Sequence, residues 1–347
     1  ADINMSGYSE VLLWRQYAAG LSTHYTQGYL NAGAASGLTK SYVNSYLMKN
    51  GLPIYAAGSG YKGDVTLSDV AADRDERLQL FLQVPGDYLS ATSELKIGPP
   101  NILDINERKS TTGYMLKKGL LGDPTYYNPA TPSINGSIVF RATEAYLNYI
   151  EASYIKNNTI DATATAYWQK LRQRAGLPTD FNLTINATDL SKEEDWAKYS
   201  ANQLVDKTLY NIRRERRSEL IGEGSRWNDL RRWRALDQVS NYQIEGFNLW
   251  DKMYEWYVDS KGVSLLKTLP DPNPNVSPKA NSKYLRPYQI RQANNLFFDG
   301  FTWTQAHYLS PIGFKNFGLA SPDGTAERSV IYQNPYWPVQ ANGTPTK

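Results

Sequence analysis

Residues 141–152 read Arg-Ala-Thr-Glu-Ala-Tyr-Leu-Asn-Tyr-Ile-Glu-Ala, and this stretch decides the fold. Its side chains at Tyr146, Tyr149 and Ile150 follow the spacing of one helix face. The helical pattern returns three times in the chain that follows, and glycines and prolines stand between the repeats. Two antiparallel helix pairs in succession favour a tetratricopeptide-like stack. The four predicted helices are 141–156, 162–175, 202–221 and 227–236.

The chain outside these helices has a different texture. Residues 1–135 are mixed and loop-rich, and we expect this region to face a ligand. Within it, bulky residues predict a strand at 10–17, a helix at 39–48, and a second strand at 78–82, where leucines alternate. The helix pairs belong to a second region, 136–347, which ends in an ordered coil tail. We expect one compact unit that is mainly α, with few short strands.

A dense charged run, Arg213-Arg-Glu-Arg-Arg-Ser-Glu219, lies in the third predicted helix. Glu215 and Glu219 are four residues apart on one helix face, as the two acids of a paired-carboxylate enzyme could be. Arginines flank both acids and depress the pKa of a carboxyl group, whereas a general acid needs a raised pKa. The run therefore favours an Arg–Glu/Asp network that locks helices together. Catalysis and a solvated charged face are the alternatives.

The composition excludes several classes of protein. The 347 residues include no cysteine and two histidines, which excludes thiolate metal sites and leaves too few imidazoles for a multi-histidine site. A net charge of +3 is too small to indicate nucleic-acid binding. Asp73 and Asp75 could ligate Ca²⁺, but without EF-hand spacing a turn with local salt bridges is favoured. We expect no catalytic residue, no metal site and no cofactor.

Aromatic residues are unusually frequent at 13%, with 26 Tyr and 9 Trp, and core packing explains most of them but less easily those in loops. Several tyrosines lie in expected loops among glycine, serine, threonine and asparagine. A flat ring packs against the apolar face of a pyranose while polar neighbours bind its hydroxyls, which predicts a sugar-binding surface. Packing of loops onto the domain is the alternative, and Trp250 and Trp256 offer a second aromatic surface. The predicted ligand-binding residues are Arg15, Tyr17, His24, Tyr25, Tyr29 and Tyr61.

An ordered set of motifs resembles the RagB/SusD family of nutrient-binding outer-membrane lipoproteins of Bacteroidetes. The helical motifs are 141–152, Leu171-Arg-Gln-Arg-Ala-Gly176, 212–220 and Glu223-Gly-Ser-Arg-Trp-Asn-Asp-Leu-Arg-Arg-Trp233. Tyr308-Leu-Ser-Pro-Ile312 and Gln333-Asn-Pro335 resemble the family's closing segment. Asp73-Arg-Asp-Glu-Arg-Leu78 resembles its RDPRL turn, with Glu76 where proline is usual.

The resemblance implies a function as well as a fold. It implies tetratricopeptide-like helix pairs, a place on the outer face of the outer membrane, and an N-terminal lipid anchor. It also implies a SusC-like TonB-dependent transporter as partner and glycan as ligand. Family members usually begin with a signal peptide, a lipidated cysteine and the first helix pairs. Because the sequence shows none of these, we expect it to be the C-terminal portion of a longer protein, without the family's N-terminal half.

The leading hypothesis is a non-catalytic glycan-binding protein that delivers oligosaccharide to the transporter. The first alternative is a protein-interaction scaffold that caps the transporter without binding sugar, because helix-pair folds often bind proteins. A glycoside hydrolase is less favoured, since it needs an unshielded carboxylate pair across a cleft.

Overall fold

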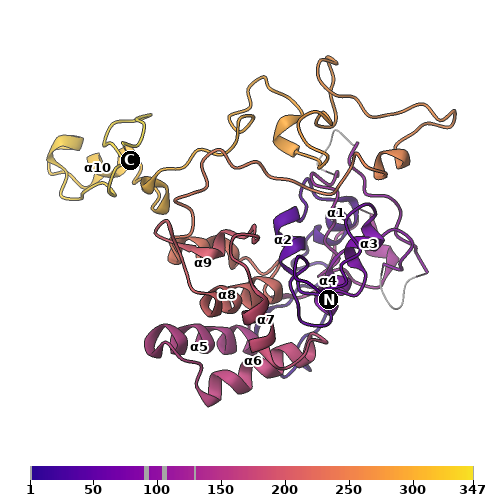
Figure 1. The fold of residues 1–347 in the computed structure, drawn as a ribbon. Helices are drawn as coiled ribbons and strands as arrows, with labels where there is room; N and C mark the ends of the chain where they lie inside the picture. Colours follow the sequence, from indigo (N-terminus) through magenta and orange to yellow (C-terminus); the bar gives the residue numbers. More distant parts are fainter. Residues whose placement is uncertain (1, 90–93, 104–107, 129, 347) are drawn as a thin grey trace.

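The computed structural model describes residues 2–89, 94–103, 108–128 and 130–346, and it is mainly helical with a few short strands (Figure 1). This confirms the predicted fold class. The α-helices are α1 Thr26–Ala32, α2 Lys40–Ser45, α3 Leu67–Ala71, α4 Glu76–Phe81, α5 Ala142–Asn157, α6 Ala162–Arg174, α7 Phe181–Ala187, α8 Lys207–Glu219, α9 Arg226–Arg232 and α10 Phe314–Leu319. The strands are β1 Val11–Arg15, β2 Ser137–Arg141, β3 Tyr199–Ser200 and β4 Gln203–Leu204. Short 3₁₀ helices occupy Pro124–Tyr127, Trp196–Lys198, Met253–Trp256, Pro287–Gln289, Gln305–Tyr308 and Ala326–Arg328.

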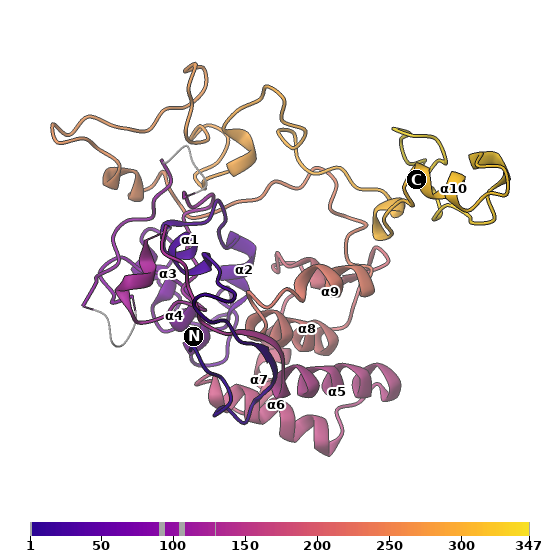
Figure 2. The same ribbon diagram turned by 180° about the vertical axis from the view of Figure 1, so that it is seen from behind.

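The helices α5 to α9 lie together on one side of the molecule (Figures 1 and 2). Helix α5 packs against α6 and α8, and Leu147, Trp168 and Ile212 are buried in the apolar core between them. The Trp168 ring stacks on Phe181 of α7, with ring centroids 4.4 Å apart. Each helix is thus held mainly by its buried face. None of the described helices has the length and apolarity needed to cross a bilayer.

Helix α8 begins later than the predicted 202–221. Strands β3 and β4 form a hairpin first, and Asn202 at its turn has φ of 63°. The Asp206 carboxylate then accepts hydrogen bonds from the backbone amides of Thr208 and Leu209, which is how an N-cap starts a helix. The predicted helix start is therefore wrong. Leu204, which falls within the predicted helix, lies 56% exposed in β4.

The strand predicted at 78–82 is also wrong, because this segment forms α4. Leu78 and Leu82 are both fully buried, whereas Leu80 is 62% exposed. Residues four apart share a helix face and the residue midway between them points away, so the alternating leucines fit a helix. The Asp75 side chain accepts a hydrogen bond from the Arg77 backbone amide and caps this helix.

A further helix, α1, contains Tyr29, one of the tyrosines that were expected to lie in loops. It ends at Gly33, whose φ of 116° is a conformation that side chains disfavour. A Cβ atom there would lie 2.4 Å from the backbone carbonyl carbon of Lys109. The helix expected at 39–48 is present as the shorter α2, and the Thr39 side chain caps it by accepting from the Tyr42 amide.

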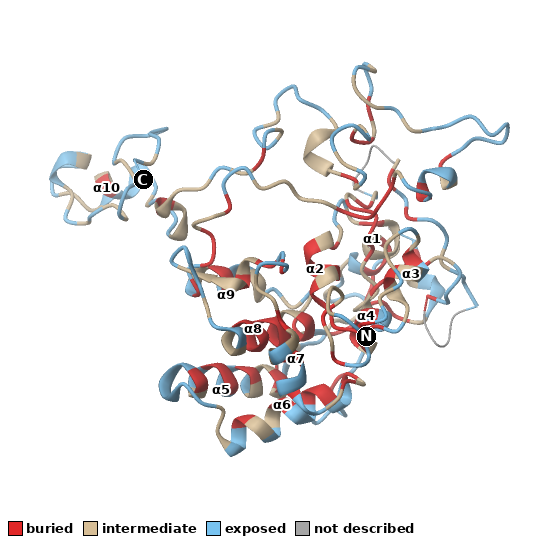
Figure 3. Ribbon diagram, viewed as in Figure 1, coloured by how far each residue is buried: buried red, intermediate tan, exposed pale blue. Residues whose placement is uncertain are grey.

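The chain beyond α9 has little regular structure. Residues 247–285 fold back onto the core of α2, α3 and α4, where Phe247 and Leu285 are buried and Trp250 and Trp256 are partly covered. The C-terminal segment that contains α10 lies apart from the rest of the molecule in both views (Figures 1 and 2). Most of it is exposed or half-buried (Figure 3), with Phe317 as its buried centre.

One small sheet links the N-terminal region to the helices. Strand β1 pairs antiparallel with β2, so that Val11 lies opposite Arg141 and Arg15 opposite Ser137. Arg141 ends β2 and α5 starts at the next residue. The pairing therefore places the segment before β1 beside the first turn of α5.

Candidate functional site

The structure brings three of the predicted ligand-binding residues together beyond the end of β1. The guanidinium carbon of Arg15 lies 4.9 Å from the centroid of the Tyr17 ring. The rings of Tyr17 and His24 meet edge to face with centroids 4.6 Å apart. His24 Nε2 lies 3.0 Å from the backbone oxygen of Asn135. Arg15, Tyr17 and His24 form one surface group, the Arg15 cluster.

The other three predicted residues have different surroundings. Tyr25 follows His24 directly and is 47% exposed, and Tyr29 is half-buried within α1. Tyr61 packs over the guanidinium of Arg74, with 5.3 Å from the guanidinium carbon to the ring centroid. Arg74 is buried in the core, and burial raises the pKa of the Tyr61 hydroxyl to about 12. None of the contacts described for Tyr61 reaches the Arg15 cluster.

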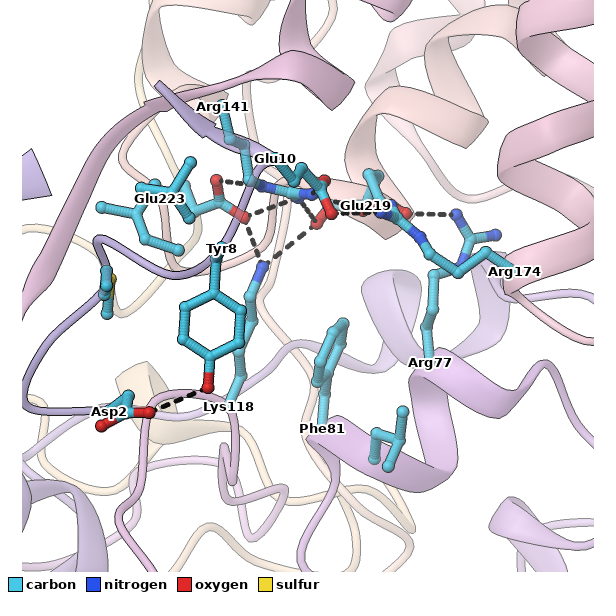
Figure 4. A pocket seen from close by; sticks show the side chains of 14 residues that line it. Asp2, Tyr8, Glu10, Arg77, Phe81, Lys118, Arg141, Arg174, Glu219 and Glu223 are labelled. Atoms are coloured by element: carbon cyan, nitrogen blue, oxygen red, sulfur yellow. Dashed lines mark hydrogen bonds and ion pairs between the residues drawn. The ribbon is translucent and has the colours of Figure 1, made fainter. Parts of the chain in front are cut away.

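A deeper site lies at the opposite end of β1 (Figure 4). A cavity of about 420 Å³ opens between the N-terminal segment, the β1–β2 pair, α4 and the C-terminal end of α8. The N-terminal segment contributes Tyr8 and Glu10, α4 contributes Phe81, β2 contributes Arg141, and α8 contributes Glu219. These elements are distant in the sequence, so only the folded chain brings their side chains to one place. This space is called the central cavity below.

One wall of the central cavity is apolar and aromatic. Tyr8 is 52% exposed, and its hydroxyl donates a hydrogen bond of 2.8 Å to the carboxylate of Asp2. Phe81 and Leu80 form the last turn of α4 beside it. The Nζ atom of Lys118 lies 4.8 Å from the centroid of the Phe81 ring. Two rings with polar groups close by thus offer flat apolar surfaces to a ligand.

The opposite wall is a network of ion pairs around Glu219 (Figure 4). Arg77 Nη1 lies 3.1 Å from Glu219 Oε2, and Arg141 Nη1 lies 2.8 Å from Glu219 Oε1. Arg174, at the end of α6, pairs with the same carboxylate. Glu10 accepts hydrogen bonds of 2.7 Å from both Arg141 and Arg174. These five residues and Glu223 are called the Glu219 cluster.

Glu223 extends the network beyond the end of α8. Gly222 has φ of 74°, which lets the chain turn back after the helix. The Glu223 carboxylate then accepts hydrogen bonds of 2.9 Å from Nε and Nη2 of Arg141, a bidentate arrangement. Lys118 Nζ donates to it at 2.5 Å. Through Glu223, the polar wall is therefore connected to Lys118, whose Nζ lies over the Phe81 ring.

The arginines keep the acids of this wall ionised. Burial opposes the ionisation of Glu219, but Arg77, Arg141 and Arg174 outweigh it and lower the pKa of this carboxyl to about 2. Burial also opposes the ionisation of Glu10, and hydrogen bonds led by the one from Thr143 lower its pKa. A carboxylate held ionised at neutral pH does not serve as a general acid.

The charge of the cavity lining is balanced. Four basic residues lie opposite four acidic ones among the residues that line the central cavity: Arg77, Lys118, Arg141 and Arg174 against Asp2, Glu10, Glu219 and Glu223. Each acid of the Glu219 cluster is bound to one or more of these cations. The lining as a whole thus suits a neutral molecule with many hydroxyl groups better than an ion.

The predicted Arg–Glu/Asp network is confirmed, and it extends further than the sequence indicated. Glu215 accepts from Arg77 at 2.5 Å and from Trp168 Nε1 at 3.0 Å, both within the protein interior. Arg232 pairs with Glu151 at 2.7 Å and with Asp229 at 2.9 Å, which links α9 to α5. The unexpected part is that the Glu219 cluster borders an open cavity.

The predicted turn directly precedes α4, which begins at Glu76. Asp75 Oδ2 lies 2.7 Å from Nη2 of Arg77, so this carboxylate is engaged in the local salt bridge that was predicted. Within the described ranges, the side chains form no group of three or more His, Cys, Asp or Glu that could hold a metal ion.

Sequence reasoning did not identify Tyr8, Glu10, Phe81 or Lys118 as site residues. They come from three segments that are distant in the sequence, and none belongs to a motif with its neighbours. The sequence feature that could have indicated this site was the strand predicted at 10–17. In the structure this strand pairs with β2, which places the N-terminal segment beside the helices. The strand wrongly predicted at 78–82 gave no indication of Phe81, which lines the cavity from the last turn of α4.

The fold defines a helix-pair protein with a cavity between its helices and its N-terminal region. Comparison with known families makes this specific, because the model of the SusD family matches residues 13–337. The chain therefore belongs to the SusD family, as the resemblance implied. No match was found among curated proteins.

One solved structure agrees with this assignment at the level of the fold. A SusD-like protein from Bacteroides fragilis matches with 18% identity and a TM-score of 0.54, over 94% of this chain and 54% of that one. A SusD-like carbohydrate binding protein from Bacteroides fragilis matches with 21% identity and a TM-score of 0.48, over 73% of this chain and 48% of that one. The chain thus spans about half the length of these relatives.

Proposed function

We propose that this chain binds glycan without catalysis, and that the central cavity is the binding site. The observation that carries the proposal is the pairing of one aromatic wall, at Tyr8 and Phe81, with one charge-balanced polar wall around Glu219. A pyranose has the same division, because its C–H groups form an apolar face and its hydroxyls point outward. The carboxylates accept from hydroxyls and the arginines donate to them. Membership of the SusD family agrees with a glycan ligand.

The geometry also sets the expected strength of binding. The cavity is open to solvent and its polar atoms already satisfy one another, so a sugar hydroxyl replaces water without gaining many new partners. We expect dissociation constants between about 1 μM and 1 mM. Ionised carboxylates that arginines hold in place support binding rather than glycoside hydrolysis.

In the complete protein, we propose that this site lies on the outer face of the outer membrane and passes oligosaccharide to a SusC-like TonB-dependent transporter. Membership of the SusD family supports this assignment. An N-terminal lipid would hold the complete protein to the membrane.

The Arg15 cluster is a second candidate surface for the same function. The proximity of Arg15, Tyr17 and His24, with Tyr25 exposed beside them, favours it. Its residues do not line the central cavity. Variants at Tyr8 and Tyr25 separate the two sites.

The test is affinity electrophoresis in native gels that contain amylopectin, arabinoxylan, galactomannan, mixed-linkage β-glucan, mucin or yeast mannan. We expect at least one polysaccharide to retard the protein, and Tyr8→Ala to weaken that retardation about tenfold, since one stacked ring contributes about 1 kcal/mol or more. Tyr332→Ala is the matched control, because this ring is 90% exposed on the C-terminal segment.

Each outcome decides between the possibilities. Retardation by none of the polysaccharides rejects glycan binding and favours the scaffold alternative, provided that binding to the transporter is retained. Loss of retardation in Tyr25→Ala but not in Tyr8→Ala moves the site to the Arg15 cluster. Release of reducing sugar during the assay contradicts the absence of catalysis.

A further inference from the structure

The central cavity is the middle one of three adjoining hollows. On one side it shares Leu80, Phe81 and Lys118 with a hollow of about 740 Å³ that Tyr88 also lines. On the other side it shares Glu10 and Arg174 with a hollow of about 480 Å³ that Tyr146 lines. These are called the Tyr88 hollow and the Tyr146 hollow. The boundaries between the three spaces thus consist of side chains that line both neighbours.

Each of the three hollows contains an aromatic ring beside a cation. Tyr88 is 54% exposed, and Lys96 Nζ lies 5.7 Å from its centroid. At the far end, Tyr146 stacks on Tyr167 with centroids 4.3 Å apart, and Lys170 Nζ lies 5.3 Å from its centroid. Tyr146 is therefore held in place by the stack, and Tyr88 is open to a ligand. The central cavity contributes Tyr8 and Phe81 between them.

The boundary between the central cavity and the Tyr146 hollow is a solvent-exposed ion pair. Glu10 Oε2 and Arg174 Nη1 lie 2.7 Å apart, and their side chains are 38% and 43% exposed. An exposed pair of this kind stabilises the fold little, so rearranging it costs little. Glu10 also accepts from Thr143, which faces the Tyr146 hollow. The pair thus offers polar atoms to a ligand that passes from one space to the other.

From this arrangement we propose that the ligand is an extended oligosaccharide whose middle units occupy the central cavity and whose two ends reach the Tyr88 and Tyr146 hollows. This inference rests on the proposed glycan-binding function. Stacking surfaces at successive places along one path suit a chain of sugar rings, each with its own apolar face. Six basic and five acidic residues line the three spaces together, which suits a neutral chain.

The experiment measures affinity as a function of chain length. Oligosaccharides of two, four and six units, prepared by partial hydrolysis of whichever panel polysaccharide retards the protein, are titrated calorimetrically. We expect affinity to rise at least tenfold from the disaccharide to the hexasaccharide. Tyr88→Ala and Tyr146→Ala should each weaken hexasaccharide binding about fivefold and change disaccharide binding less than twofold. Tyr332→Ala should change neither.

The possible results separate this inference from the proposed function. A disaccharide that binds as tightly as the hexasaccharide overturns the extended site and leaves glycan binding intact. The same conclusion follows if length matters but Tyr88→Ala binds the hexasaccharide like the unaltered protein. Should no polysaccharide or oligosaccharide bind at all, the proposed function fails and the extended site fails with it. Since Tyr88 is exposed, its variant tests the idea even if Tyr146→Ala does not fold.

Discussion

Two clusters of arginines and acids meet on helix α8, and they differ in access to water. Asp195 is fully buried between Arg217, at 2.9 Å, and Arg226. Glu219 is buried to a similar degree. Its partner Arg174 is 43% exposed and lines the central cavity, whereas Arg217 and Arg226, the partners of Asp195, are 11% and 31% exposed. Arg217 and Glu219 are two residues apart, so they point to nearly opposite sides of the helix. Arginine–carboxylate pairs thus fill an interface between helices around Asp195, whereas around Glu219 they border a cavity that a ligand can enter.

The difference separates structural charge from recognition. A buried ion pair whose atoms are enclosed by protein fixes the position of the helices around it. An ion pair with one exposed partner can exchange a contact with water for a contact with a ligand hydroxyl. Breaking the first cluster should destabilise the protein strongly, whereas altering Arg174, the exposed partner in the second, should mainly change binding.

The largest effect is expected from Asp195→Ala. This change leaves Arg217, whose side chain is 11% exposed, and Arg226 without their shared buried carboxylate. Breaking a buried pair costs about 3–5 kcal/mol of folding free energy. Glu194→Ala is the matched control, because Glu194 is the adjacent residue, is 40% exposed, and pairs with Lys40 at 2.6 Å. That surface pair should cost about 1 kcal/mol or less. Urea unfolding followed by circular dichroism measures both, and equal costs would remove the distinction between the clusters.

The next effect is acid destabilisation through Glu219. Its pKa is lowered to about 2 in the folded protein, from an ordinary value of 4.5. A depressed pKa stabilises the folded state above the unfolded value, and that contribution is lost as pH falls from about 5 to 2. We expect a loss on the order of 3 kcal/mol from this group. Urea unfolding at each pH measures this loss. The Glu219→Gln variant should be less stable than the unaltered protein at neutral pH, but its free energy of unfolding should change less between about pH 5 and pH 2.

Secondary structure was predictable from the sequence where the residues of a single segment, such as its apolar spacing and its end residues, determine its conformation. The pattern over 141–156 indicates α5 because the apolar spacing and the flanking residues lie within the helix. The strand predicted at 78–82 failed because short leucine patterns fit a strand or a helix, and tertiary packing of Leu78 and Leu82 decides between them. The helix predicted from 202 failed because the capping role of Asp206 outweighs the pattern before it.

The candidate site was harder to predict, for a physical reason. The predicted grouping of Arg15, Tyr17 and His24 depends on residues close in sequence, and the structure does bring them together. Whether they bind a ligand stays a prediction. The central cavity depends on contacts between residues such as Tyr8 and Glu219, which are distant in sequence and carry no shared pattern. The charged residues in the sequence also could not show which arginine–carboxylate pairs are exposed to solvent.

A smaller effect is expected from Arg174→Gln. The change removes one of three arginine partners of Glu219 and the exposed contact with Glu10, while Arg77 and Arg141 remain. We expect about 1 kcal/mol or less of destabilisation, because the side chain is largely exposed. Hexasaccharide binding should weaken about threefold, since the ion pair stands between two hollows. Calorimetry measures the binding, and a loss as large as that of Tyr8→Ala would show that the polar wall dominates recognition.

The smallest effect should be that of salt. The central cavity holds equal numbers of acidic and basic residues, and the proposed ligand is neutral, so no net charge attraction exists for salt to screen. We expect the dissociation constant of the hexasaccharide to change less than twofold between about 50 mM and 500 mM sodium chloride, where the screening length falls from about 14 Å to 4 Å. Unfolding at the same salt concentrations controls for changes in the protein. Affinity that falls steeply with salt would indicate an acidic glycan, bound through arginines such as Arg174 that are released from their carboxylate partners.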